Sequence, residues 1–214
     1  MPSKRTYAFA AILFMLSSLA WGSEKAGFFV KPHLDWSSLG NDELLIEGAS
    51  GKARYDSGFA TGLAFGYDYG NGFRSELDFE YRTNEYSSVD LADGSRLTGG
   101  DFSSAILYLN GYYFFHRANR AWSPFIGLGL GWIQEIDFDA GGSATEVSFS
   151  QSGDWAYQWM AGVEYQLSSA WQLQARINHI NISGLKLKEE GGAGRIQGAD
   201  YRVWGVGAGL VYRF

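Results

Sequence analysis

Residues 73–82 read FRSELDFEYR, a run in which apolar or small residues alternate strictly with charged ones. Successive side chains of a β-strand point to opposite faces. This run therefore predicts a strand with one oily face and one fully charged face. The charged face would carry Arg74, Glu76, Asp78, Glu80 and Arg82.

The same two-residue period recurs along the rest of the chain. Residues 59–69 alternate in this way, and Gly70-Asn71-Gly72 has the composition of a hairpin turn before residue 73. Further segments with this period are 28–36, 102–115, 126–132, 155–167, 173–177 and 206–214. The connections at 70–72, 116–123 and 168–171 are short, whereas those at 37–56, 83–101, 137–153 and 181–199 are long. Eight strands joined in this manner predict an all-β, antiparallel up-and-down barrel with both termini on the side of the short turns.

The composition supports β-structure and excludes several classes of protein. The 214 residues include 29 Gly but only 3 Pro, and 17% are aromatic. The absence of Cys excludes disulfide frameworks, thiolate metal sites and thiol catalysis. A net charge of −6 argues against nucleic-acid binding. A mean hydropathy of −0.17 argues against a bundle of apolar transmembrane helices.

Residues 1–22 have the features of a secretory signal peptide. A basic Lys-Arg pair precedes an apolar run, and Ala20-Trp21-Gly22 places small residues at the positions that a signal peptidase reads. The apolar run is too short for a membrane-spanning helix. We expect cleavage after Gly22 and a mature barrel domain of residues 23–214.

Aromatic side chains indicate that the oily faces meet lipid. A lipocalin-like barrel would point its apolar face inward, but the narrow interior of eight strands fits Gly, Ala and a few long charged side chains better than Trp and Phe. Two aromatic belts match the two interfaces of a bilayer. The belt near the short turns would contain Tyr67, Tyr69, Phe73, Tyr165, Trp171, Tyr212 and Phe214, and the belt near the long connections Trp36, Tyr81, Trp132, Trp155 and Tyr157. We therefore expect an eight-stranded transmembrane barrel of a Gram-negative outer membrane, with four long extracellular loops and short periplasmic turns, closed by pairing of 203–214 with 28–36.

Four segments resemble strands of a known family. Residues 110–114 (NGYYF), 124–131 (PFIGLGLG), 155–167 (WAYQWMAGVEYQL) and 207–214 (GAGLVYRF) are similar to strands of the small outer-membrane β-barrel superfamily, which includes opacity-type surface antigens and porin-family proteins. The resemblance covers the whole mature chain. It implies the barrel fold, the outer-membrane location and a C-terminal assembly signal, for which the matching residues are Leu210, Tyr212 and Phe214. Its implied partners are the outer-membrane assembly machinery, periplasmic chaperones, outer-membrane lipid and lipopolysaccharide. It does not imply one function, because the superfamily is functionally mixed.

The inward-facing charges form the first candidate site. We expect an interior network of Asp68, Arg74, Glu76, Asp78, Glu80, Arg82, Glu164 and Arg176, joined by Lys31, His33, Asp35 and Gln158. Both signs are interspersed, as a self-neutralising salt-bridged core requires. An ion path or a proton relay is the alternative interpretation, although a selective pore more often shows one dominant sign.

Residues 179–186 form the second candidate, because they resemble the seventh strand of outer-membrane lipid A deacylases. Those enzymes place a nucleophilic Ser two residues after a His and a Glu further on, whereas Asn181 occupies the nucleophile position here. The nearest hydroxyl and carboxylates in sequence are Ser183, Glu189 and Glu190. The paired Asp-Asp and Asp-His motif of omptin-like proteases is also missing, and His33, His116 and His179 are too scattered to suggest a metal site. We expect no catalytic residues, no cofactor and no metal.

The long connections are the third candidate, because a rigid barrel presents its loops for binding. Segments 37–56, 137–153 and 181–199 combine charged residues with Gly or Ser. The leading hypothesis is a non-enzymatic protein of the surface-antigen type, which supports the envelope and binds a host or cell-surface ligand through its loops. The alternatives are a narrow porin for small solutes or ions and a lipid A-modifying enzyme.

Overall fold

The computed structural model describes residues 26–39, 42–46, 49–91, 96–97, 100–115, 121–141, 146–189 and 195–214. The regular structure in these ranges consists of β-strands. Within the described ranges, no helix is long and apolar enough to span a membrane. The predicted signal peptide at 1–22 lies outside the described residues.

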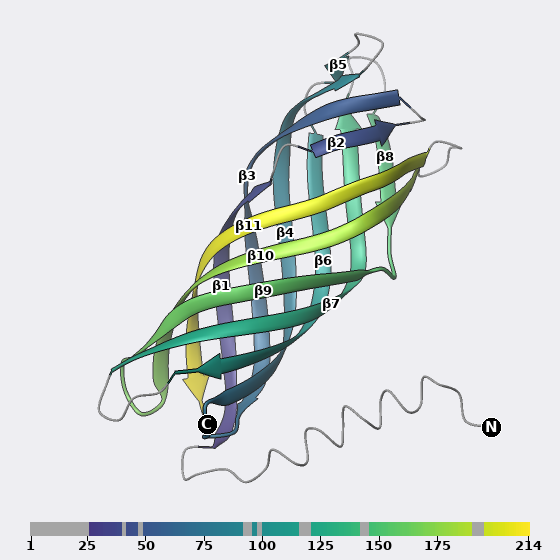
Figure 1. Cartoon of the computed structure of the whole chain (residues 1–214). Coiled ribbons are helices and arrows are strands. Elements are labelled where there is room, and N and C mark those ends of the chain that lie inside the picture. Colours follow the sequence, from purple (N-terminus) through teal and green to yellow (C-terminus); the bar gives the residue numbers. More distant parts are fainter. Residues whose placement is uncertain are drawn as a thin grey trace, which may run out of the picture.

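Eight long strands form a closed antiparallel barrel (Figure 1). They are β1 (Gly27–Leu39), β3 (Ala49–Asp68), β4 (Phe73–Leu91), β6 (Gly100–Phe114), β7 (Trp122–Gly141), β9 (Trp155–Gln166), β10 (Trp171–Glu189) and β11 (Arg195–Arg213). Each strand pairs with the next in this order, and β11 pairs back with β1, so that Val30 lies opposite Tyr212 and Trp36 opposite Val206. The predicted eight-stranded fold and its closing strand pair are confirmed.

Three short strands extend the barrel at the end opposite the C-terminus (Figure 1). The strand β2 (Asp42–Ile46) pairs with both β3 and β11, and therefore continues the position of β1 in the wall. In the same way β8 (Glu146–Gln151) pairs with β7 and β10 and continues the position of β9. The two-residue strand β5 (Arg96–Leu97) pairs with β4.

The predicted long connections therefore consist largely of paired strand in the described ranges. The alternating pattern failed to reveal these extensions because it depends on lipid lying against one face of a strand. Beyond the bilayer both faces of a strand can meet water, and backbone pairing continues without an oily row.

The wall alternates between exposed apolar and buried polar residues, as predicted. On β4, Phe73, Leu77, Phe79 and Tyr81 are 45–53% exposed, whereas the intervening charged residues are only 0–3% exposed. Inward-facing glycines leave room for their neighbours' side chains. A Cβ atom on Gly129 would overlap the Asn110 amide, and one on Gly207 would overlap the Asp35 carboxylate.

The turn between β3 and β4 agrees with its predicted hairpin composition. Gly70 and Gly72 both have positive φ angles, of 71° and 94°, which a residue with a side chain rarely adopts. The Asp68 carboxylate accepts a hydrogen bond from the Gly70 backbone at 2.8 Å. One belt residue differs from expectation: Tyr69 is only 5% exposed, because its ring packs against Tyr67 and its hydroxyl lies 3.0 Å from Ser75 Oγ.

Candidate functional site: the charged interior

Five strands supply the charged side chains of the interior. β1 contributes Lys31, His33 and Asp35, and β4 contributes the row from Arg74 to Arg82. Asp68 comes from the end of β3, Glu164 from β9 and Arg176 from β10. All of these side chains are buried, because the two-residue period turns alternate residues of each strand toward the same enclosed space.

The layer nearest the short turns is centred on Arg74. Its guanidinium donates to Glu164 Oε2 at 2.6 Å and to Asp68 Oδ2 at 2.9 Å. The same group lies over the ring of Phe114 at 4.2 Å and over the ring of Phe29 at 4.9 Å. Two carboxylates and two aromatic faces therefore surround one cation, which fills this end of the barrel.

The middle layer is centred on Glu76. Its Oε1 atom accepts from Lys31 Nζ at 2.8 Å, from the Tyr112 hydroxyl at 2.6 Å and from Asn110 Nδ2 at 3.1 Å. Tyr112 also belongs to a buried apolar cluster, which contains Phe114, Phe125 and Met160 as well. The sequence predicted the charged members of this layer but not Asn110 and Tyr112. Asn110 and Tyr112 occupy even positions of 102–115, which face the interior, and this alternation was the available signal. It was ambiguous because the neighbouring Tyr113 is also aromatic and faces outward.

The next layer is centred on Arg176. Its guanidinium makes two hydrogen bonds to the Asp35 carboxylate, at 2.9 and 2.8 Å, and lies 3.5 Å from Glu80. Glu80 also accepts from Arg82 Nη2 at 2.8 Å. The network therefore links β1, β4 and β10 through charges that alternate in sign.

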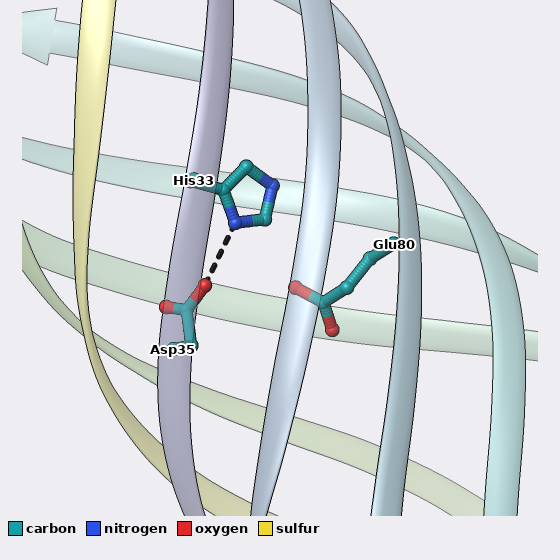
Figure 2. A group of neighbouring side chains, drawn as sticks. All are labelled: His33, Asp35 and Glu80. Carbon is teal, nitrogen blue, oxygen red and sulfur yellow. Dashed lines mark hydrogen bonds and ion pairs between the residues drawn. The ribbon is translucent and has the colours of Figure 1, made fainter.

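His33 lies between two carboxylates of this layer. Its Nδ1 atom is 2.7 Å from Asp35 Oδ2, and its Nε2 atom is 2.9 Å from Asp78 Oδ1. Figure 2 shows His33 and Asp35 on one strand, with Glu80 reaching toward them from another. The possible ligand atoms of His33, Asp35 and Glu80 lie within 4.8 Å of one another, a spacing that could hold a metal ion.

A guanidinium nitrogen already occupies the centre of that group. Arg176 Nη2 is 2.8 Å from Asp35 Oδ2, 3.0 Å from His33 Nδ1 and 3.5 Å from Glu80 Oε2. A metal ion there would have to displace a buried arginine and separate it from its carboxylates. We therefore interpret the group as part of a salt-bridge network.

An apolar layer lies beyond the charges, toward the extended end of the barrel. It consists of Ile106, Ile133, Ile136, Ile180, Ile182 and Val203, which are all 0–2% exposed. One member of this layer, Ile136, breaks the alternation of its strand. Gln134 and Glu135 are consecutive exposed residues, so β7 carries a bulge there and Ile136 points inward despite its even number.

The remaining predicted residues lie outside the interior network. His179 is on the outer wall between Trp159 and Trp204, and Asn181 is half-exposed on the same face. The side chains of Ser183 and Glu189, and all of His116 and Glu190, lie outside the description. Of the C-terminal residues, Leu210 and Phe214 are 38% and 73% exposed, and Tyr212 packs on Trp171 at a ring separation of 4.7 Å.

Comparisons with known proteins agree with this architecture. The chain resembles OprG from Pseudomonas aeruginosa, with 19% identity, a TM-score of 0.64 and coverage of 88% of this chain and 97% of that one. It also resembles Neisserial surface protein A, with 17% identity, a TM-score of 0.57 and coverage of 88% and 99%. At these identities the likeness concerns the fold alone.

A curated relative and a family profile give the same placement. Outer membrane protein W of Vibrio cholerae serotype O1 is 24% identical over 95 residues, which span 43% of this chain and 44% of that protein. The profile described as outer membrane protein beta-barrel domain matches residues 7–214. The chain therefore belongs to the outer membrane protein beta-barrel domain family and is a protein of the Gram-negative outer membrane.

Proposed function

We propose that the chain is a non-enzymatic outer-membrane protein of the surface-antigen type, which anchors a strand-built extension to the cell surface for contact with a host or cell-surface ligand. The filled interior is the observation that carries this proposal. Lys31, Asp78 and Asn178 are 0% exposed although they point into the barrel. A water-filled pore would leave such lumen-facing side chains exposed, so an interior of this kind suits an anchor better than a passage.

The extension beyond the membrane is the second support. A tilted strand crosses a bilayer in about 9–11 residues, which corresponds to the interval from Phe73 to Tyr81 on β4. The strand then continues to Leu91, and β10 similarly continues from His179 to Glu189. Paired backbone holds this extension in a fixed shape, which suits recognition of another surface.

The anchor interpretation predicts an electrically silent protein. We would record single-channel currents from the refolded mature chain in a planar bilayer, with folding verified by β-type circular dichroism. The expected result is no stable conductance step. Salt-proportional steps that change when Glu80 or Arg82 is replaced would refute the anchor and establish the narrow porin.

The binding role is tested by shortening the extension. Asp42 lies opposite Ala53, so replacement of residues 43–52 by Asn-Gly should close the hairpin without disturbing that pair. Gram-negative cells that display equal amounts of wild-type or shortened protein would be compared for adhesion to an epithelial monolayer. We expect the shortened protein to mediate less adhesion. Equal adhesion by both, or adhesion no greater than that of cells without the protein, would contradict the proposal.

The enzyme alternative is tested separately. Asn181 lacks the hydroxyl that an acyl-transfer nucleophile needs. We therefore expect mass spectrometry to find the same acyl chains on lipid A incubated with or without the refolded protein. Loss of an acyl chain that depends on His179 would overturn the non-enzymatic assignment.

We further propose that Leu210, Tyr212 and Phe214 form the signal that the outer-membrane assembly machinery reads. These residues project outward at the end of the last strand, and the rings of Tyr212 and Phe214 contact each other at 5.2 Å. Deletion of Phe214 should reduce the amount of folded barrel in outer-membrane fractions while leaving refolding into detergent unchanged. An unchanged amount in the membrane would refute this role.

A further inference from the structure

The chain contains two Asn-Gly dipeptides, and the barrel places them in opposite surroundings. Asn71-Gly72 lies in the turn between β3 and β4, whereas Asn110-Gly111 lies within β6. This dipeptide is chemically labile because glycine has no Cβ atom to shield its backbone nitrogen, which can attack the carboxamide carbon of the preceding asparagine. The surroundings of each dipeptide therefore determine whether the same reaction takes place.

The turn holds the side chain of Asn71 in an arrangement that favours this attack. Asn71 is exposed, and its Oδ1 atom accepts a hydrogen bond from the Phe73 backbone N–H at 3.0 Å. The ring that this hydrogen bond closes includes the Gly72 nitrogen, so the carboxamide stays folded back over the attacking atom. The same N–H stabilises the negative charge that Oδ1 acquires when the carboxamide carbon becomes tetrahedral. Water also has access to the exposed side chain.

The barrel protects Asn110 from the same reaction. Its side chain is only 1% exposed, and its Nδ2 atom donates to Glu76 Oε1 at 3.1 Å. Its Oδ1 atom accepts from Gln158 Nε2 at 2.9 Å. The backbone of Gly111 is paired with both neighbouring strands, β4 and β7. Attack by the Gly111 nitrogen would require the peptide to rotate out of both ladders, which happens only when this part of the barrel opens.

We propose that Asn71 is a site of spontaneous covalent modification in the folded barrel, while Asn110 is protected for as long as the barrel stays closed. The Gly72 nitrogen forms a bond to Asn71 Cγ, and the bond between Cγ and Nδ2 breaks. Nδ2 leaves as ammonia and takes with it the proton of the Gly72 nitrogen. Water then opens the resulting succinimide at either carbonyl, which leaves aspartate or isoaspartate at position 71.

The modification changes the turn in two ways. Both products add a negative charge at the end of the barrel where the chain terminates, since Gly27 pairs with Asp68 and Phe28 bonds to Phe214 there. Isoaspartate also routes the main chain through the former side chain, so the turn becomes one atom longer. The reaction needs only water, and it is independent of any ligand contacted by the extension.

Trypsin separates the two sites for a direct test. Cleavage after arginine yields the fragments 55–74 and 97–117, each of which contains one Asn and no Gln. The mature protein would be refolded into phosphatidylcholine nanodiscs and incubated at neutral pH. Mass spectrometry would follow the conversion of each fragment to its acid form, and methyl transfer by an isoaspartyl methyltransferase would identify isoaspartate. Asn71 should convert at least about a hundredfold faster than Asn110. Equal rates in the folded protein, or no measurable conversion of Asn71, would overturn the proposal.

The same chain unfolded in urea is the matched control, because neither dipeptide is then held by structure. Folding should slow the conversion of Asn110 by at least about a hundredfold and that of Asn71 by less than about tenfold. Asn71→Gln keeps an exposed carboxamide but enlarges the ring that must close, so its fragment 55–74 should stay unconverted over the same period. Heat-dependent mobility on gels verifies that the variant is folded. Equal slowing of both sites by folding, or wild-type conversion of fragment 55–74 in the variant, would refute the site.

Discussion

Removal of the Arg74 side chain tests whether the interior is dry and held by charge pairs. The guanidinium is 2–3% exposed and pairs with Glu164 at 2.6 Å and Asp68 at 2.9 Å. Arg74→Met would leave both carboxylates buried beside Phe29 and Phe114. Arg213, which lies 3.3 Å from Asp68, would compensate only one of them. Breaking a buried pair by removing one partner typically costs about 3–5 kcal/mol of unfolding free energy, and we expect a loss in that range.

A second variant separates unpaired charge from lost packing. The triple change Asp68→Asn, Arg74→Met and Glu164→Gln removes all three charges while nearly keeping their volumes. Replacement of a whole buried ion group by neutral residues is often near neutral, so the triple variant should recover most of the loss. Urea unfolding from lipid vesicles, followed by tryptophan fluorescence, measures both variants. The exposed change Arg202→Gln serves as a control and should cost less than about 0.5 kcal/mol. The dry-interior reasoning is wrong if Arg74→Met unfolds at the wild-type midpoint, or if the triple variant is no more stable than the single one.

Three further predictions concern the lipid face, the ion network and the precursor. Leu63 is 57% exposed on β3 and faces the middle of the bilayer. Leu63→Arg should therefore lower the unfolding free energy by ~2–4 kcal/mol in the vesicle assay, whereas Ser57→Arg near the interface should lower it by ~1 kcal/mol or less. Equal losses would contradict the assigned depth. Glu80→Ala removes a partner of both Arg82 and Arg176 and should cost about 3–5 kcal/mol if the site is dry, and an unchanged midpoint would instead indicate a hydrated interior that favours a pore. Sequencing of the N-terminus of protein extracted from outer membranes should give Ser23 as the first residue, and a chain that still begins at residue 1 would refute cleavage after Gly22.

Much of the membrane-spanning part could be predicted from sequence because the lipid-facing side chains of each strand must be apolar, whereas the interior side chains can be polar or charged. The charged row from Arg74 to Arg82 has no other placement that avoids exposing charges to hydrocarbon. Residues 102–115 were harder to interpret, since Tyr112 points inward and Tyr113 outward, and an aromatic side chain suits either the interior or the belt. After the bulge at Gln134 and Glu135, even-numbered residues of β7 face inward instead of odd-numbered ones. A simple two-residue period cannot reveal such a change.

The geometry of the candidate sites was less predictable. The alternation along each strand indicates that His33, Asp35 and Arg176 face the interior. Which carboxylate pairs with the Arg176 guanidinium depends on the register between β1 and β10, and these two strands are separated by β11 in the wall. The contacts of His179 with Trp159 and Trp204 depend in the same way on the register of three strands. No local sequence pattern contains that information, because the register follows from closure of the whole barrel.

The separation in sequence between partners of the interior network has a consequence for biogenesis. Arg176 and Asp35 are 141 residues apart, Lys31 and Glu76 are 45 apart, and the wall closes only when the Phe214 backbone donates to Phe28 at 3.0 Å. A chain that lacks its last strands keeps the Lys31–Glu76 pair but loses Arg176, so the Asp35 carboxylate stays without that partner on a sheet with an open edge. Such a sheet partitions poorly into hydrocarbon. Stable insertion thus becomes conditional on a full-length chain, so that truncated translation products remain in the periplasm, where proteases can degrade them.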